Sequence, residues 1–191
     1  MGLTRGSTAQ LADASRLGPR VKPGDDELGT ASCTDRGGPV WLSRTRLPVG
    51  TQGFENEAEL EQELVRLGVE IVHPERRSVA AMAGLFARRP VVAGTVASAF
   101  MAALFCPNPA PIVALSPSPI VNPSFPMLDR AAGHRARYLY AESDHLGIDM
   151  GRRIWSAFRL RDPATTAGEL LAAMQEATFA DSARCGTSPP C

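Results

Sequence analysis

Polar residues follow each of four short apolar stretches, and several of them are of the kinds that bind anions. They are Ser43-Arg44 after the first stretch, His73-Pro74-Glu75 after the second, Gly94-Thr95 after the third and Ser116-Pro117 after the fourth. A guanidinium, hydroxyl groups and free backbone N–H groups are common partners of a phosphate or carboxylate. The pattern therefore predicts an anion site, provided that the four segments meet at one place in the fold.

The third of these stretches, VVAGTVASAFMAALF from Val91 to Phe105, is the most informative. Its β-branched run stops at Gly94, and small and hydroxyl residues then lead into apolar residues with helical spacing. A strand, a tight turn and a helix start, in this order, present backbone N–H groups to a phosphate or carboxylate in α/β proteins. The alternative is an ordinary connection of a parallel sheet, because a glycine after a strand is common.

The elements that must position these residues alternate along the chain between strands and helices. Asn56, with Glu59 in the capping-box position, predicts the start of the first helix, and Gly68 its end. Alternation over short connections predicts an α/β fold, a Rossmann-like parallel sheet with helices on both faces. Ligands bind beyond the carboxyl ends of the strands in such a sheet, so the polar segments should converge there. We expect strands at 40–43, 69–73, 91–93, 112–115 and 136–141, and helices from 56, 78, 98–105 and 162.

Two further segments and the two ends of the chain show no such alternation. The proline-studded segment 116–126 and the acidic segment 142–149 predict loops. We expect an irregular or disordered leader at 1–39, one domain at 40–180 and a disordered tail at 181–191. Apolar residues at helical spacing predict the side chains that face the core. These are Leu60, Leu64 and Leu67, then Val79, Met82, Leu85 and Phe86, and finally Leu170, Leu171 and Met174.

Composition excludes several classes of function. The chain has 191 residues and a formal net charge of +0, so no global field attracts nucleic acid or anionic lipid. No apolar run reaches the roughly 18 residues of a membrane-spanning helix, and the first residues lack the apolar core of a signal peptide, which predicts a cytoplasmic protein. The 4 cysteines form no CxxC pair and have no histidine at zinc spacing, so we expect no metal.

Four sequence motifs together resemble the family-61 glycosyltransferases: WLSR at 41–44, ENEAEL at 55–60, GVEIVHPE at 68–75 and VVAGTVASAF…ALF at 91–105. The resemblance runs from about residue 40 to about residue 142 and corresponds to the C-terminal half of the family's two-domain GT-B fold. It implies a domain that binds a nucleotide sugar, and transfer of the sugar to a glycan acceptor in the synthesis of capsular-type polysaccharides. The resemblance implies no metal or other cofactor.

The resemblance also implies roles for individual residues around the donor. Arg44 matches the arginine of the family's Ser-Arg motif and is the implied diphosphate partner, with Ser43 beside it. Gly94, Thr95 and Ser98 match the turn that approaches the donor. A fixed guanidinium and helix N-terminal amides stabilise the charge that grows on a departing nucleoside diphosphate.

Three acidic or amide residues have a second interpretation. Glu75 is implied to bond to the ribose or base, and an exposed loop carboxylate is the alternative. Asn56 and Glu57 match the family's Asn-Glu pair, whose simplest role is to cap the helix that follows, and contact with the ligand is the alternative.

The chain departs from the family pattern at several positions. Ala81 and Met82 replace a Glu-Gln pair, Ala97 replaces a glycine and Met101 replaces a histidine. No residue matches a catalytic base, and nothing matches the acceptor-binding half. We therefore expect a truncated enzyme or a partner chain that supplies the missing half. The alternatives are an inactive remnant that serves as a binding or interaction module, and an unrelated nucleotide-binding domain, although the absence of GxGxxG disfavours a dinucleotide.

Overall fold

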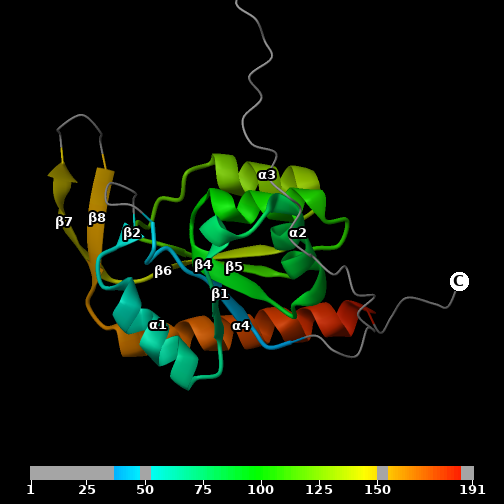
Figure 1. Cartoon of the computed structure of the whole chain (residues 1–191), viewed down its shortest axis with the longest axis horizontal. Helices are drawn as coiled ribbons and strands as arrows, with labels where there is room; N and C mark the ends of the chain where they lie inside the picture. The colour runs from blue at the N-terminus through cyan, green and yellow to red at the C-terminus, as the bar shows by residue number, and fades with distance from the viewer. Residues whose placement is uncertain (1–36, 48–52, 150–154, 186–191) are drawn as a thin grey trace, which may run out of the picture. The chain divides into compact units, whose positions relative to one another are not determined.

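The computed structural model describes residues 37–47, 53–149 and 155–185, so residues 1–36 of the leader predicted at 1–39 lie outside them. Five parallel strands form the main sheet in the order β3-β1-β4-β5-β6. Figure 1 shows β1, β4 and β5 of this sheet between layers of helices. The α/β class and the Rossmann-like parallel sheet are confirmed. The strands are β1 (Val40–Leu42), β3 (Glu70–Val72), β4 (Val92–Thr95), β5 (Ile112–Ser116) and β6 (Ala136–Tyr140).

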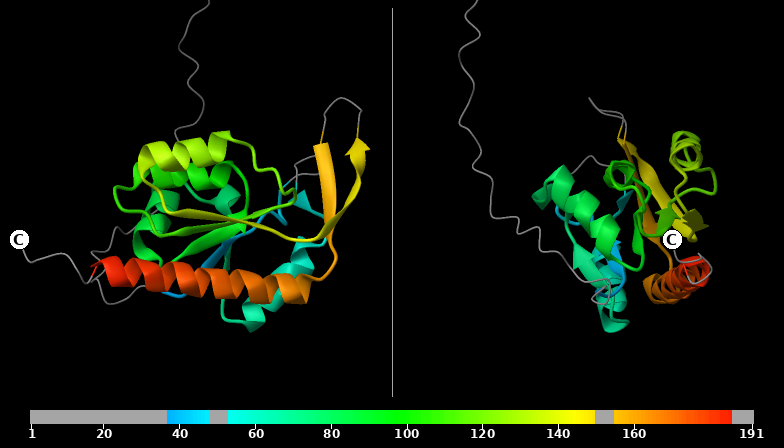
Figure 2. Two further views of the ribbon diagram at one scale, coloured as in Figure 1. Left: turned by 180° about the vertical axis from the view of Figure 1, so that it is seen from behind. Right: turned by 90° about the vertical axis from the view of Figure 1, so that its right-hand side faces the viewer.

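Helices cover both faces of this sheet, as predicted. On one face lie α1 (Glu57–Arg66) and α4 (Pro163–Cys185), and Figure 2 shows α4 running along the sheet. On the other lie α2 (Val79–Arg88), the 3-10 helix η2 (Ser98–Phe105) and α3 (Ser124–Ala132). A short 3-10 turn, η1 (Pro74–Arg76), follows β3.

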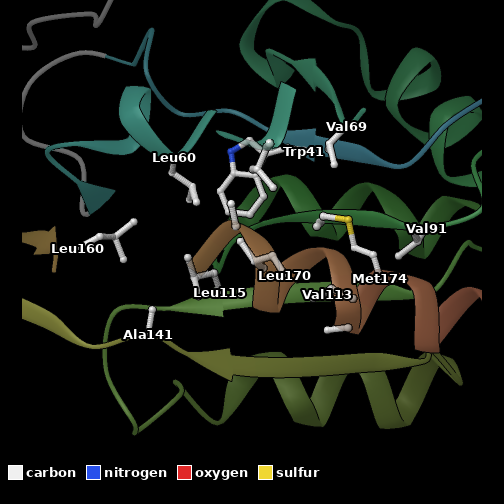
Figure 3. Close-up of a cluster of buried hydrophobic side chains, with 14 of the residues drawn as sticks. Trp41, Leu60, Val69, Val91, Val113, Leu115, Ala141, Leu160, Leu170 and Met174 are labelled. Carbon is white, nitrogen blue, oxygen red and sulfur yellow. The ribbon is translucent and has the colours of Figure 1, made fainter. Parts of the chain in front are cut away.

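The strands alternate between two apolar clusters because successive side chains point to opposite faces. Trp41 and Leu115 pack toward α1 and α4, where Figure 3 shows the Trp41 indole among Leu60, Leu170 and Met174. Leu42, with residues of β4 and β5, packs toward α2 and η2. Most of the predicted core residues are buried, including those of the strands rich in Ile, Leu and Val.

Two predicted core residues are on the surface. Leu67 is 42% exposed because α1 ends before it, at Arg66, and Val79 is 59% exposed because it opens α2 on the solvent side. The helical period was correct in both cases, but a residue in the first or last turn of a helix projects past the sheet.

The segment 98–105 is a helix with the predicted bounds, and it has the 3-10 form over its whole length. Its two buried residues, Phe100 and Ala103, lie three positions apart. That spacing fits three residues per turn, so the 3-10 form keeps both on the side that faces the sheet.

Both segments predicted to be loops contain regular structure. Helix α3 begins within the proline-studded segment, and Pro126 is tolerated in its first turn because the N–H groups there have no partner within a helix. The acidic segment forms strand β7 (Ser143–Asp149), which pairs antiparallel with β8 (Trp155–Leu160). With β2 (Gly53–Phe54) these strands form a second, three-stranded sheet.

Candidate active site

Three of the four polar segments meet at a cleft where the direction of winding of the sheet reverses, whereas Ser116-Pro117 does not line it. Along the chain, β3 is added to one side of β1 and β4 to the other, so the connections diverge at the β1/β4 boundary. Ligands of doubly wound sheets bind at this boundary, beyond the carboxyl ends of the strands. A cleft of about 260 Å³ lies there, and its lining includes the predicted Ser43, Arg44, Glu75, Thr95 and Ser98.

Arg44 carries the positive charge of the cleft. It follows β1, and burial lowers the pKa of its guanidinium while the nearby Glu57 carboxylate raises it. Its Nε atom is buried and has no hydrogen-bond partner among the described residues. A buried N–H donor without a partner is costly, so this atom is suited to a ligand that accepts its hydrogen bond.

The strand ends beside Arg44 add hydroxyl groups and free backbone. Thr95 is buried, and its Oγ1 likewise has no partner in the described part of the chain. Ser98 is exposed at the first position of η2. The hydroxyl of Ser43 lies 2.8 Å from that of Thr45, and the Ser43 N–H donates to Val72 at 2.8 Å, which ties the ends of β1 and β3 together.

Glu75 lies in η1 at the outer edge of the cleft. Its Oε1 atom is 3.9 Å from Nδ1 of His73, and the residue is exposed. The position permits a hydrogen bond to a ligand in the cleft.

Glu57 was interpreted from sequence mainly as a capping residue, and its burial against the backbone of Arg44 was not predicted. It is only 3% exposed, and its Oε1 accepts hydrogen bonds from Trp41 Nε1 at 3.1 Å and from the backbone N–H of Arg44 at 3.0 Å. Burial raises its pKa to about 7, against the hydrogen bonds from Arg44 and Trp41, which lower it. The available signal was its place three and seven residues before Leu60 and Leu64, on the same apolar stripe of α1.

Asn56 does not cap α1 with its side chain, so the predicted capping role is wrong. Its amide donates to the carbonyl of Leu160 at 3.1 Å, and its Oδ1 accepts from the N–H of Leu160 at 2.9 Å. The residue is buried and joins the start of α1 to the end of β8. A tertiary partner 104 residues away cannot be read from local pattern.

Gly94 is required by packing between neighbouring strands. A Cβ there would lie 3.0 Å from Leu42 Cβ and 3.1 Å from the Leu42 carbonyl oxygen. Gly94 is buried in β4 and is not part of the cleft lining, so its implied contact with a donor stays a prediction.

The departures from the family pattern leave the cleft intact. Ala97 lines it in an extended conformation, with φ −160° and ψ 168°, which needs no glycine. Met101 lines a small separate cavity with Phe125 and Leu128 of α3.

A larger groove, of about 530 Å³, lies at the amino ends of the strands against α4. Its lining contains no charged residue and is dominated by apolar side chains such as Leu171 and Phe179. An anion needs charged or polar partners, so the smaller cleft is the better candidate for an anion site. In the described ranges no group of three or more His, Cys, Asp or Glu residues is arranged to hold a metal, and no helix there has the length and apolarity needed to cross a bilayer.

A family model described as Glycosyltransferase 61 matches residues 15–113, just over half of the chain. The matched range contains β1, α1, β3, α2, β4 and η2, and therefore every residue named above as lining the cleft. No curated protein and no solved structure matches the chain.

Proposed function

The chain belongs to the glycosyltransferase 61 family, and on that premise we propose that its cleft binds the diphosphate of a nucleotide sugar. In this proposal the chain is the donor-binding part of an enzyme that transfers a sugar to a glycan acceptor in polysaccharide synthesis. The domain then corresponds to the C-terminal half of a GT-B fold.

One observation carries the proposal: Arg44 Nε and Thr95 Oγ1 are both buried without a partner among the described residues, and both residues line the cleft at the reversal point of the sheet. Native proteins satisfy most buried polar groups. Two unsatisfied donors around one cleft are accounted for by an oxygen-rich anion that accepts both hydrogen bonds.

A diphosphate also suits the chemistry of sugar transfer. As the sugar leaves, negative charge grows on the phosphate nearest to it, and a fixed guanidinium stabilises that charge without reorganising. Arg44 supplies the guanidinium, and Thr95 and Ser98, at and after the end of the neighbouring strand β4, supply hydroxyl groups. Glu75 then accepts a hydrogen bond from the ribose or base.

The described residues offer no group that we nominate as a catalytic base. In the proposal, the base and the acceptor site come from a second domain or a partner chain. An inactive module that retains only the fold is the alternative, and the buried unsatisfied donors in the cleft disfavour it.

A thermal-shift screen with UDP-, GDP- and CDP-sugars tests the proposal. We expect at least one of them to stabilise the native chain, and Arg44→Ala to abolish the shift. Arg66→Ala is the matched control, because Arg66 is exposed on α1 and pairs only with Glu63 among the described residues. Absence of a shift with all three classes, or an equal shift in Arg44→Ala, would count against donor binding.

A further inference from the structure

The buried carboxyl of Glu57 lies next to the cleft and is bonded to the backbone of the arginine that lines it. Its Oε1 atom accepts from the Arg44 N–H at 3.0 Å and from Trp41 Nε1 at 3.1 Å. A carboxyl that is 3% exposed interacts strongly with charges nearby, because little water screens it. Its charge is therefore coupled to any anion that enters the cleft beside Arg44.

Two charged side chains face Glu57 in the part of the chain that the structure describes. The guanidinium of Arg44, after β1, favours the ionised carboxyl, and Glu61, one turn later on α1, disfavours it. Trp41 on β1 contributes a neutral donor. Glu61 is bound by the hydroxyl of Thr45 at 3.5 Å through Oε2, while its buried Oε1 has no partner in the described ranges.

We infer that Glu57 is a positioning residue that also sets the charge of the cleft, so that a diphosphate binds at Arg44 together with a proton. This inference rests on the proposed function, since it concerns the same cleft. An ionised Glu57 offsets the guanidinium and opposes an incoming anion, whereas a neutral Glu57 leaves the positive charge of Arg44 uncompensated. The proton comes from solvent and ends on the Glu57 carboxyl, and no bond to the ligand forms or breaks.

The direction of the pH dependence follows from the apo site. Burial raises the pKa of Glu57 to about 7, so both forms are populated near neutral pH. A bound anion raises it further, because like charges disfavour the carboxylate. For each unit by which the bound anion raises the pKa of Glu57, binding is about tenfold tighter at a pH below both pKa values than at a pH above them. Affinity should therefore increase as pH falls.

Isothermal titration of the native chain with a nucleotide sugar measures this coupling. The diphosphate of a nucleotide sugar is esterified at both ends, so its charge is constant between about pH 6 and pH 8.5 and the change reports on the protein. We expect binding to be about tenfold tighter at the lower pH. Repeating the titration in two buffers with different heats of ionisation should show net proton uptake.

Glu57→Gln separates titration from positioning. Glutamine keeps a carbonyl oxygen for the Arg44 N–H and the Trp41 indole but carries no proton equilibrium. We expect the variant to bind with the same affinity at both pH values, near that of the native chain at the lower one. If the variant does not fold, proton uptake by the native chain in the two buffers decides the matter.

His73→Gln is the matched control, because His73 is a titratable side chain beside Glu75 at the same edge of the sheet. We expect it to keep the tenfold dependence. Equal affinity of the native chain at both pH values overturns the inference, as does a dependence that Glu57→Gln keeps and His73→Gln loses. Absence of binding at every pH instead refutes the proposed function on which the inference rests.

Discussion

The bridge made by Asn56 can be tested by substitutions that separate it from helix capping. Its side chain bonds to both backbone groups of Leu160, at 3.1 Å and 2.9 Å, and the residue is 5% exposed. The bridge fixes the first turn of α1, and Glu57 is the next residue. The position of the carboxyl beside Arg44 therefore depends on it.

The expected loss follows from the groups left behind. Asn56→Ala leaves the buried N–H and C=O of Leu160 without partners, at about 1–3 kcal/mol each, so we expect a loss of about 2–5 kcal/mol in the free energy of unfolding. Asn56→Asp keeps an acceptor for the N–H but places a carboxylate oxygen against the Leu160 carbonyl. We expect it to cost at least about 2 kcal/mol.

Urea denaturation followed by circular dichroism measures both losses. A capping role predicts a different pattern, because aspartate caps about as well as asparagine and alanine costs only about 1 kcal/mol. Ser78 is the matched control, since its hydroxyl accepts from the Ala81 N–H at 3.1 Å as a true cap of α2. Ser78→Asp should be nearly neutral. If Asn56→Asp is also neutral, the bridge does not stabilise the fold and our reasoning is wrong.

Three further substitutions test the charge beside the cleft and the packing of the sheet and of α4. The carboxyl of Glu57 ionises near 4.5 when unfolded and at about 7 when folded, so the native chain should lose about 3 kcal/mol of stability as pH rises through that range. Glu57→Gln should lack this loss, and parallel stability profiles from urea denaturation at several pH values would contradict it. Gly94→Ala should lower stability by about 1–3 kcal/mol, because its Cβ meets Leu42 at 3.0 Å. In α4, a Cβ at Gly168 meets nothing within 4 Å, so Gly168→Ala should raise stability by about 0.5–1 kcal/mol. Urea denaturation measures both glycine variants, and similar effects of the two would refute the packing argument.

The order of elements and the convergence of the cleft were predictable from sequence. Alternating strands and helices imply a parallel sheet, and the carboxyl ends of its strands share one edge. Ser43, Glu75 and Thr95 could therefore be placed together without coordinates. The helical spacing of apolar residues also predicted most of the buried core.

The remaining features depend on contacts between distant parts of the chain. At a helix start, a capping asparagine and a bridging one have the same local sequence, so the partner of Asn56 on β8 was invisible. Glu57 carries a charge that argues for exposure, and only its register with Leu60 and Leu64 argued for burial. The prolines of segment 116–126 predicted a loop in place of α3. A proline is tolerated in the first turn of a helix, but the sequence does not show where that turn begins.

A structure of the chain bound to a nucleotide sugar tests the central claim most directly. We predict that diphosphate oxygens lie within hydrogen-bond distance of Arg44 Nε and Thr95 Oγ1, the two buried atoms that have no partner among the described residues. A donor seated instead in the apolar groove against α4, with both atoms still unsatisfied, would contradict the assignment of the cleft.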